Sequence, residues 1–225
     1  MKISGSGRLS EGEINDSLDV SGSVKIEGDF KCTGFRSSGS MRGDGNLTVL
    51  GDIRSSGSFR IKGNLQGDGN AKFSGSGSAG GNVSIKGELG SSGSFRAGNK
   101  VEALQGIRFS GSASVQGGLN SQKNIDMEGS AIISGDINGD NIYIGTRMSR
   151  AKKMLKQPFK VNGNILAQNK VNITGTLVDG DVKGRDIRLG QGTEILGAVY
   201  YVDNFEKHQK TKLTNEPIQI SEEDL

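Results

Sequence analysis

The sequence lacks the residues on which several common kinds of fold depend. It has no tryptophan, two prolines and a single cysteine, Cys32, and aromatic residues make up only 5% of the chain. One cysteine cannot form an internal disulfide, so the fold does not depend on an oxidising compartment. With 32% hydrophobic residues, the composition favours a narrow core shared along a repeat array over a thick globular core.

Long apolar runs are also absent. No stretch approaches the ~18 apolar residues of a transmembrane helix, and the opening M-K-I-S-G-S-G has neither a signal-peptide core nor a glycine at position 2 for myristoylation. We therefore expect a cytoplasmic protein. The net charge of +3 is too small to indicate a nucleic-acid partner, and none is expected.

Glycine is the residue in excess, with 37 in 225 residues against an average near 7%. It recurs every six residues, and asparagine takes the same position at Asn99 and Asn141. Because asparagine is the best substitute for glycine where φ is positive, we expect left-handed corners at this position. The main run comprises Gly45, Gly51, Gly57, Gly63, Gly69, Gly75, Gly81, Gly87 and Gly93.

Two apolar positions, two residues apart, separate successive glycines, which is typical of a short strand followed by a bend. The phrase R-S-S-G-S-M-R at 36–42 also returns in related form at 54–60, 72–78, 90–96 and 108–114, always 18 residues later. Three hexads per turn predict an all-β protein, a single-stranded β-helix with about 18 residues per triangular turn and about ten turns. Stacking by 18 predicts one interior column of Leu47, Leu65, Val83, Val101, Leu119 and Ile137.

The 18-residue register also predicts how large and small residues share the interior. Phe59 follows Ser55 in one turn, whereas Phe73 precedes Gly77 in the next. Each turn then supplies one large and one small group, as constant packing density requires. On the surface the same register predicts ion pairs of Asp44 with Lys62 and of Asp68 with Lys86.

The hexads divide the chain into three parts. We expect an N-terminal segment at 1–13, a β-helix at 14–202, and a polar tail at 203–225 that forms a frayed helix or stays disordered. A glycine-free basic insert at 146–160 interrupts the β-helix and suits a short helix.

The rungs resemble those of the bactofilins, the polymer-forming cytoskeletal proteins of bacteria. V-K-I-E-G-D at 24–29 and F-R-I-K-G-N-L at 59–65 carry this likeness, which covers roughly 14–200. The resemblance implies a right-handed β-helix that assembles end to end into nucleotide-independent filaments and scaffolds partners. This chain is longer than the usual member and lacks the Pro-rich tails of the family.

No residue pattern indicates an enzyme. The only histidine, His208, lies in the polar tail, and Asp52, Asn70 and Glu88 stack as a mixed ladder that we interpret as solvated. Hexapeptide acyltransferases share the six-residue period, but the small residue after each aliphatic position and the embedded histidine are missing here. Cys32 falls at an inward position. We expect no catalytic residues, no cofactor and no metal site.

Polymerisation is the predicted activity, because a β-helix without caps ends in two open rungs. The expected partners are other copies of the chain, with a paralogue as a further candidate. The alternative is that the tail at 203–225 caps the C-terminal rung. The residues predicted at the polymer interface are Ile14, Leu18, Val20, Val199, Tyr200, Tyr201, Val202 and Phe205.

Basic residues suggest a second kind of contact. The insert has two interpretations, a flap packed on the solenoid or a contact with an acidic partner or the inner face of the membrane. Two basic columns also flank the S-G-S phrase, Arg36, Arg54, Lys72 and Arg108 on one side and Arg42, Arg60 and Arg96 on the other; they are either a solvated face or a docking site for an anionic surface. The basic residues of the insert are Arg147, Arg150, Lys152, Lys153, Lys156 and Lys160.

A monomeric surface-binding solenoid, such as an ice-binding or adhesin-like module, is the rival function. Serines stack beside the basic columns and could form a flat hydroxyl ladder. The flanking arginines argue against this alternative. The stacked serines are Ser38, Ser56, Ser74, Ser92 and Ser110.

Overall fold

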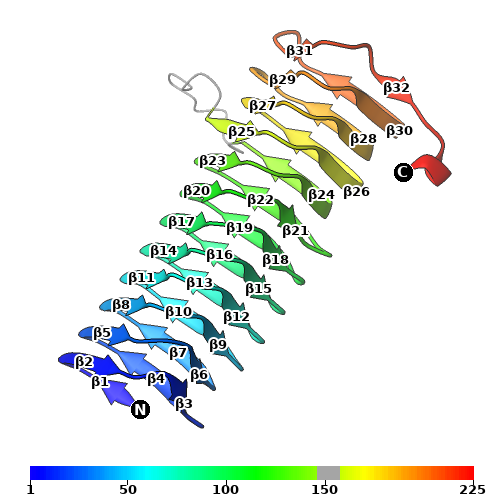
Figure 1. The fold of residues 1–225 in the computed structure, drawn as a ribbon. Helices are drawn as coiled ribbons and strands as arrows, with labels where there is room; N and C mark the ends of the chain where they lie inside the picture. The colour runs from blue at the N-terminus through cyan, green and yellow to red at the C-terminus, as the bar shows by residue number, and fades with distance from the viewer. Residues whose placement is uncertain (146–157) are drawn as a thin grey trace.

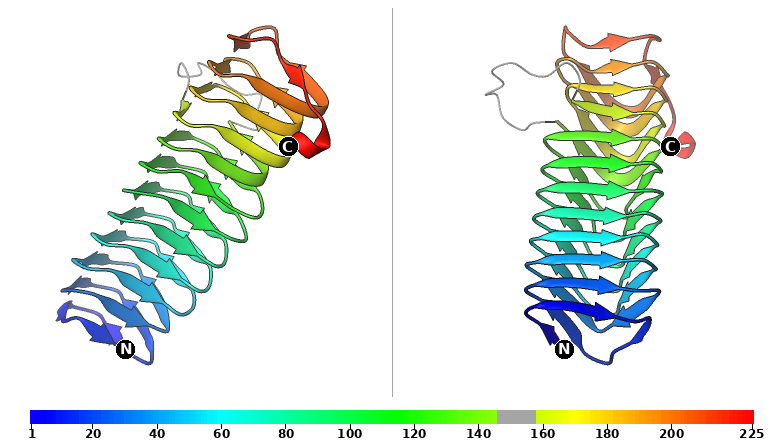
Figure 2. Two further views of the ribbon diagram at one scale, coloured as in Figure 1. Left: turned by 45° about the vertical axis from the view of Figure 1, so that its right-hand side comes forward. Right: turned by 60° about the vertical axis from the view of Figure 1, so that its left-hand side comes forward.

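The computed structural model describes residues 1–145 and 158–225. The chain winds into a stack of about 11 turns of roughly 18 residues, with short parallel strands separated by corners (Figure 1). Strands of successive turns pair side by side along the whole stack (Figure 2). This confirms the β-solenoid that the hexads predict.

The strands lie on three faces. Face 1 begins with β1 (Lys2–Ile3), β4 (Ser17–Val20), β7 (Gly34–Ser37), β10 (Ile53–Ser55), β13 (Ala71–Phe73), β16 (Leu89–Ser91), β19 (Ile107–Phe109) and β22 (Ile125–Met127). Face 2 is a 12-stranded sheet of β2 (Ser6–Leu9), β5 (Ser23–Ile26), β8 (Ser40–Gly43), β11 (Ser58–Ile61), β14 (Ser76–Ala79), β17 (Ser94–Ala97), β20 (Ser112–Val115), β23 (Ser130–Ile133), β25 (Phe159–Val161), β27 (Thr176–Val178), β29 (Glu194–Ile195) and β31 (Lys212–Leu213).

Face 3 begins with β3 (Gly12–Glu13), β6 (Phe30–Cys32), β9 (Leu47–Val49), β12 (Leu65–Gly67), β15 (Val83–Ile85), β18 (Val101–Ala103) and β21 (Leu119–Asn120). Later turns join faces 3 and 1 in long strands, β24 (Ile137–Ile144), β26 (Ile165–Ile173), β28 (Val182–Leu189) and β30 (Val199–Lys207), and the last strand of face 3 is β32 (Ile218–Gln219). A 3-10 helix, η1 (Glu222–Asp224), ends the chain.

Along each strand, side chains point alternately into the core and out to solvent. In β11, Phe59 and Ile61 are buried while Arg60 is exposed, which is the period-2 pattern of a strand with one solvated face. The predicted interior column is confirmed, because Leu65 lies in register with Leu47 and Val83. The 18-residue period therefore sets the pairing register.

The sequence predicts left-handed backbone at the corner glycines, but most of them are required because successive corners approach closely. Gly57 and most of its equivalents do not have a positive φ; a methyl group on Gly57 would overlap the carbonyl oxygen of Gly39 one turn below. Close stacking of corners, rather than left-handed backbone, excludes larger residues there. Positive φ values among the described glycines occur at Gly12, Gly28, Gly106, Gly129, Gly145, Gly175 and Gly192.

Phenylalanines form a zigzag ladder inside the stack, between faces 1 and 2. The ring centroids of Phe59 and Phe73 are 5.2 Å apart, and those of Phe73 and Phe95 are 5.6 Å apart. Small residues occupy the alternate places, since Ser55 lies in register with Phe73 and Gly77 with Phe59. The predicted pairing of large with small residues is confirmed.

The solenoid extends further at both ends than the sequence predicts. The segment 1–13 is its first turn, in which β1, β2 and β3 pair with β4, β5 and β6. The segment 203–225 is neither a frayed helix nor a disordered tail, because it contains the end of β30 and the strands β31 and β32 of the last turn. These end turns account for about 11 turns instead of ten.

Candidate functional site

The N-terminal end of the stack is an uncovered rung. Within the described residues, β1, β2 and β3 have a partner strand on one side only, so their other edges are free. Ile3, Leu9 and Ile14 pack onto the core from this rung and remain partly exposed. The rung therefore combines free backbone groups with an apolar centre.

Only one of the three predicted N-terminal interface residues lies in this rung. Ile14 does, but Leu18 and Val20 are 0% and 3% exposed. The first turn covers them, with Ile3 in register with Val20. Ile3 and Leu9 take their place, and the six-residue spacing between them is the sequence signal that would have identified them.

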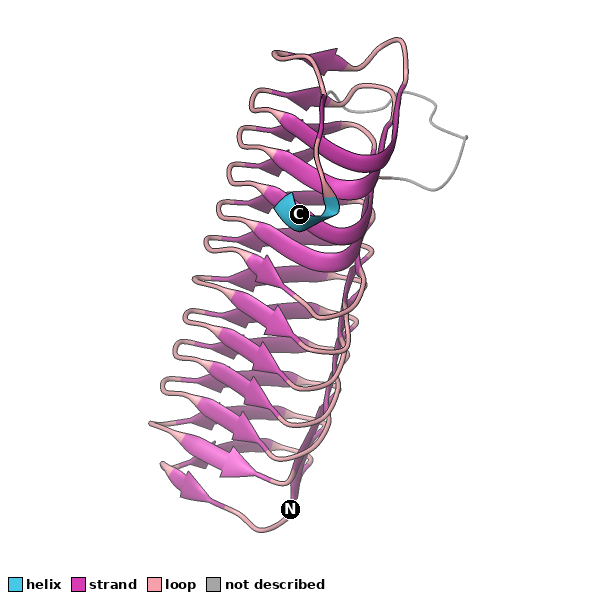
Figure 3. Ribbon diagram, turned by 90° about the vertical axis from the view of Figure 1, so that its right-hand side faces the viewer, coloured by secondary structure: helices cyan, strands magenta, loops and turns pink. Residues whose placement is uncertain are grey.

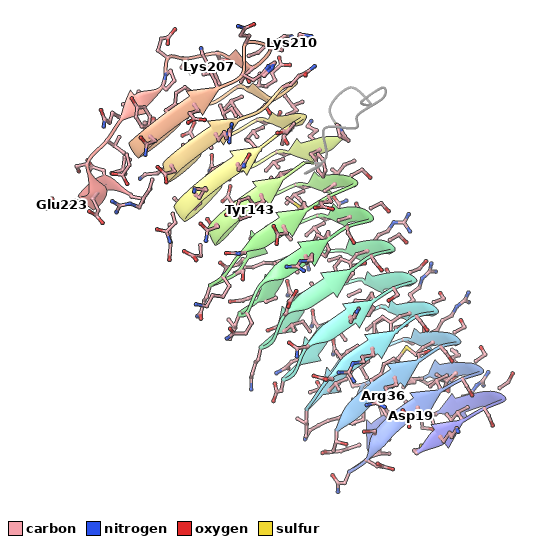
Figure 4. The ribbon with its side chains drawn as sticks, turned by 180° about the vertical axis from the view of Figure 1, so that it is seen from behind. Asp19, Arg36, Tyr143, Lys207, Lys210 and Glu223 are labelled. Atoms are coloured by element: carbon pink, nitrogen blue, oxygen red, sulfur yellow. The ribbon has the colours of Figure 1, made fainter. Side chains whose placement is uncertain are left out.

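The C-terminal end is a second uncovered rung with aromatic residues at its centre. Tyr201 and Phe205 are partly buried with ring centroids 5.6 Å apart, and Leu213 packs beside the core from β31. Of the strands described, β31 pairs only with β29 and β32 only with β30. Figure 4 shows Lys207 and Lys210 at this end of the molecule.

The remaining predicted residues at this end are placed differently. Val199 is 1% exposed, inside the stack, and so is not available to a second molecule. Tyr200 is partly exposed and pairs with Ile218 of β32 on face 3. Val202 follows at the corner, where its carbonyl oxygen accepts a hydrogen bond of 2.9 Å from Gln219 Nε2. Leu213 was missed because the sequence around it carries no hexad glycine.

The last residues of the chain do not cover the C-terminal rung. After β32 they run back along face 3, where η1 lies beside earlier turns (Figure 3). Arg185 Nη1 pairs with Glu222, Arg185 Nε lies 2.9 Å from Asp203 Oδ2, and Lys183 Nζ donates to the carbonyl oxygen of Asp224. Residues 203–225 do fold over the preceding rung, as the alternative predicts, because β31 pairs with β29 and β32 with Tyr200 and Tyr201 of β30. They form a further turn of the solenoid, and the outer edges of β31 and β32 have no partner among the described strands.

The basic insert can be placed only at its boundaries. Arg147, Arg150, Lys152, Lys153 and Lys156 lie outside the described residues, so both interpretations of the insert remain predictions. The chain leaves face 1 at Ile144 and joins face 2 at Phe159. Lys160 lies in β25, and its Nζ is 3.4 Å from Asp179 Oδ2.

The other polar residues named from the sequence have structural partners. Asp52 Oδ1 accepts the N–H of Asn70 at 2.9 Å, and Asn70 Oδ1 accepts the N–H of Glu88 at 2.9 Å, so this ladder joins successive turns. Cys32 is 0% exposed, and burial raises the pKa of its thiol to about 11. His208 is exposed in the last turn, where its Nδ1 accepts the N–H of Lys210 at 3.1 Å.

The described residues offer neither a metal-binding cluster nor a membrane-spanning helix. Over residues 1–145 and 158–225, no three His, Cys, Asp or Glu side chains are grouped so that they could hold a metal ion. Within the same ranges, no helix has the length and apolar composition needed to cross a bilayer.

The two end rungs are thus the principal candidate site, and their chemistry suits binding to another strand edge. Each offers unpaired backbone donors and acceptors around an apolar centre. A comparison of the chain with protein-family models, curated proteins and solved structures found no significant match.

Proposed function

We propose that this chain is a structural protein that assembles end to end into filaments without a nucleotide and acts as a cytoskeletal scaffold, as its resemblance to bactofilins implies. The observation that carries the proposal is the uncovered rung at each end of the solenoid. An exposed strand edge next to apolar side chains is a template for another strand, and solenoids that stay monomeric carry polar caps.

In the proposed filament, like ends meet. An N-terminal rung stacked on a second N-terminal rung buries Ile3, Leu9 and Ile14 of both copies, and a C-terminal contact does the same for Phe205 and Leu213. Such a filament has no polarity. Assembly then draws on apolar burial and strand pairing alone, which is why no nucleotide is required.

A double substitution at one end tests both the assembly and its orientation. Phe205→Asp with Leu213→Asp places two charges in the C-terminal rung. If like ends meet, this variant stops at dimers joined through the N-terminal rung. Adding Ile3→Asp and Leu9→Asp blocks that rung as well and leaves monomers. Light scattering distinguishes the two masses.

The matched control moves the same change to the side of the solenoid. Leu50 and Ile132 are exposed apolar residues, at 46% and 53%, away from both ends. Leu50→Asp with Ile132→Asp should form filaments like the wild type. Monomers from the C-terminal variant would show head-to-tail stacking instead, and filaments from it would show that the rung is not the interface.

One alternative function has an observation in its favour. The serine column at Ser38, Ser56 and Ser74 is exposed and repeats at every turn, as an ice-binding surface would require. A second serine column, Ser40, Ser58 and Ser76, lies across the corner glycines from it. Arginines flank the two columns on their outer sides, which argues against this function. Thermal hysteresis by a monomeric wild type would favour this function over assembly.

A further inference from the structure

One edge of the solenoid carries cations on both of its sides. The corner between faces 1 and 2 is formed by Ser-Gly pairs such as Ser56 and Gly57, and we call it the Ser-Gly edge. On face 1 its flanking row is Arg36, Arg54, Lys72 and Arg108; on face 2 it is Arg8, Lys25, Arg42, Arg60 and Arg96.

Like charges are stacked directly along part of each row, although Gly90 separates Lys72 from Arg108 and Ser78 separates Arg60 from Arg96. Arg36 lies in register with Arg54, and Arg42 with Arg60. Neighbouring like charges across paired strands destabilise a sheet. Elsewhere the same fold places opposite charges one turn apart: Lys62 Nζ is 2.7 Å from Asp44 Oδ1, and Lys86 Nζ is 3.0 Å from Asp68 Oδ1. Stability alone does not account for the rows.

Most of these cations have no acidic partner. In the described part of the chain, five of the nine cations form no ion pair within 4.0 Å: Arg36, Lys72, Arg42, Arg60 and Arg96. The other four are paired, since Arg54 lies 2.8 Å from Asp52, Arg108 3.5 Å from Asp126, Arg8 3.5 Å from Glu27, and Lys25 3.1 Å from Glu27 and 3.2 Å from Asp44. Figure 4 shows Arg36 next to Asp19, at the lower end of the face 1 row. The Ser-Gly edge therefore keeps five unpaired cations, although Asp19, in register with Arg36, and Glu88 also line its grooves. At another corner Lys62 and Lys86 are each paired with an acid.

Hydrogen-bond donors without acceptors lie on the same edge. Gly57, Gly75 and Gly93 are partly exposed residues whose backbone amides donate to no described residue, whereas the amide of Gly63 at another corner donates to the carbonyl oxygen of Gly45 at 3.1 Å. Beside them, a shallow groove of about 390 Å³ runs between the face 1 row and the serine column. A second groove of about 510 Å³ continues it over the next turns and shares Lys72 and Ser74 with the first.

We infer that the Ser-Gly edge docks on a lipid surface rich in anionic phospholipid headgroups. The cations lie on two faces that meet at one corner, so a flat surface reaches both rows at once. A single extended polyanion would lie along only one of them. Lipid headgroups are mobile, so they can bind cations that are irregularly spaced. Their phosphates also accept hydrogen bonds from arginine and from unpaired backbone amides. No exposed aromatic side chain lines the grooves to stack on nucleic-acid bases.

This inference does not rest on filament formation. The edge runs parallel to the solenoid axis, so a single molecule presents it whole. End-to-end assembly would align the edges of many copies and raise the avidity of the same contact. A failure to bind lipid, with filaments intact, would therefore count against the edge alone.

The test replaces edge cations without adding repulsion. The edge variant carries Arg36→Gln, Arg42→Gln, Arg60→Gln and Arg96→Gln. The control variant carries Lys31→Gln, Lys62→Gln, Lys86→Gln and Lys100→Gln, all on other surfaces and all paired with acids. Both variants lose the same net charge. Sedimentation with vesicles of phosphatidylglycerol and phosphatidylcholine, or of phosphatidylcholine alone, measures binding.

We expect the wild type to bind only the anionic vesicles and to dissociate as salt rises from about 0.1 M to about 1 M, where the screening length falls to about 3 Å. At about fivefold for each lost cation, the edge variant should bind at least about 100-fold more weakly. The control should stay within about fivefold of the wild type. Because the edge variant removes like-charge stacking, its Tm should not fall, whereas that of the control should.

Four results would overturn the inference. The wild type could fail to bind anionic vesicles. Equal losses in both variants would show that only net charge matters. Binding to soluble polyglutamate but not to vesicles would assign the edge to an acidic protein. Loss of binding in a variant with Lys152→Glu, Lys153→Glu and Lys156→Glu, with the edge variant unaffected, would assign the contact to the insert.

Discussion

At the residue scale, the interior between faces 1 and 2 depends on the pairing of one large with one small side chain in each turn. A Cβ atom on Gly77 would lie 3.0 Å from Phe73 Cγ and 3.1 Å from Phe95 Cδ2. The site is therefore already full. Interiors of this density respond to one added methylene.

Gly77→Phe should destabilise the protein by about 1–3 kcal/mol or more, as overpacking does. Adding Phe73→Ser should recover much of that loss, because the double variant copies the turn in which Phe59 accompanies Ser55. Chemical denaturation of the wild type, the two single variants and the double variant measures the coupling free energy between the two substitutions. Losses that simply add would contradict the packing scheme.

A second residue-scale prediction concerns acid stability. The N–H of Asn46 donates to Asp29 Oδ1 at 2.7 Å and its Nδ2 to Oδ2 at 2.9 Å, and these bonds lower the pKa of Asp29 from its ordinary 3.8. A lowered folded-state pKa adds stability above the ordinary pKa, and that stability is lost as pH falls through the folded value.

Asp29→Asn should remove this pH dependence while keeping the acceptor, because Asn46 fills the same role toward the N–H of Asn64 at 2.8 Å. The Tm of the wild type should fall relative to that of the variant as pH drops below about 4. Thermal melts from neutral to acidic pH measure the difference. A Tm difference between the two proteins that stays constant over this pH range would show that Asp29 does not contribute to acid sensitivity.

At the scale of the elements, the corners fix the height of each turn. Gly57→Ala would press a methyl group against the carbonyl oxygen of Gly39, whereas a Cβ atom on Gly90, in β16, meets nothing within 4 Å. We expect Gly57→Ala to destabilise by about 1–3 kcal/mol and Gly90→Ala to be neutral or stabilising by up to about 1 kcal/mol. Denaturant unfolding compares the two variants, and equal effects would contradict the stacking account of the corners.

The sequence predicts the middle of the solenoid well because its signals repeat. The 18-residue phrase predicts that Arg54 faces Lys72, and the structure places them in register. The five-residue step between Gly34 and Gly39 reflects a turn of 17 residues, in which Ser23 pairs with Ser40. Each such residue has the same environment above and below it, so one pattern describes them all.

The ends and the later turns are harder to predict because their environments differ. The first turn packs on one side only, so Ile3, Leu9 and Ile14 suffice without a full set of apolar positions. In β26 the chain bends from face 3 to face 1 through a register shift between Leu166 and Lys170 rather than at a glycine. A β-bulge bends a strand without a glycine. The six-residue recurrence of glycine is therefore less regular in these later turns.

At the scale of the whole molecule, the candidate surfaces run in different directions. The uncovered rungs cross the solenoid axis at its two ends, while the Ser-Gly edge runs parallel to that axis (Figures 2 and 3). Assembly through the rungs leaves the edge exposed in every copy. Growth of a filament and its contact with a partner surface are therefore separable properties of one fold.

Electron microscopy of the purified wild type tests the central claim most directly. With turns spaced about 4.7–4.9 Å apart, about 11 turns make a subunit roughly 50–55 Å long. We predict unbranched filaments one solenoid wide, formed without nucleotide, with a layer line at the spacing of the turns. Isolated rods of one subunit's length at every protein concentration would contradict the account.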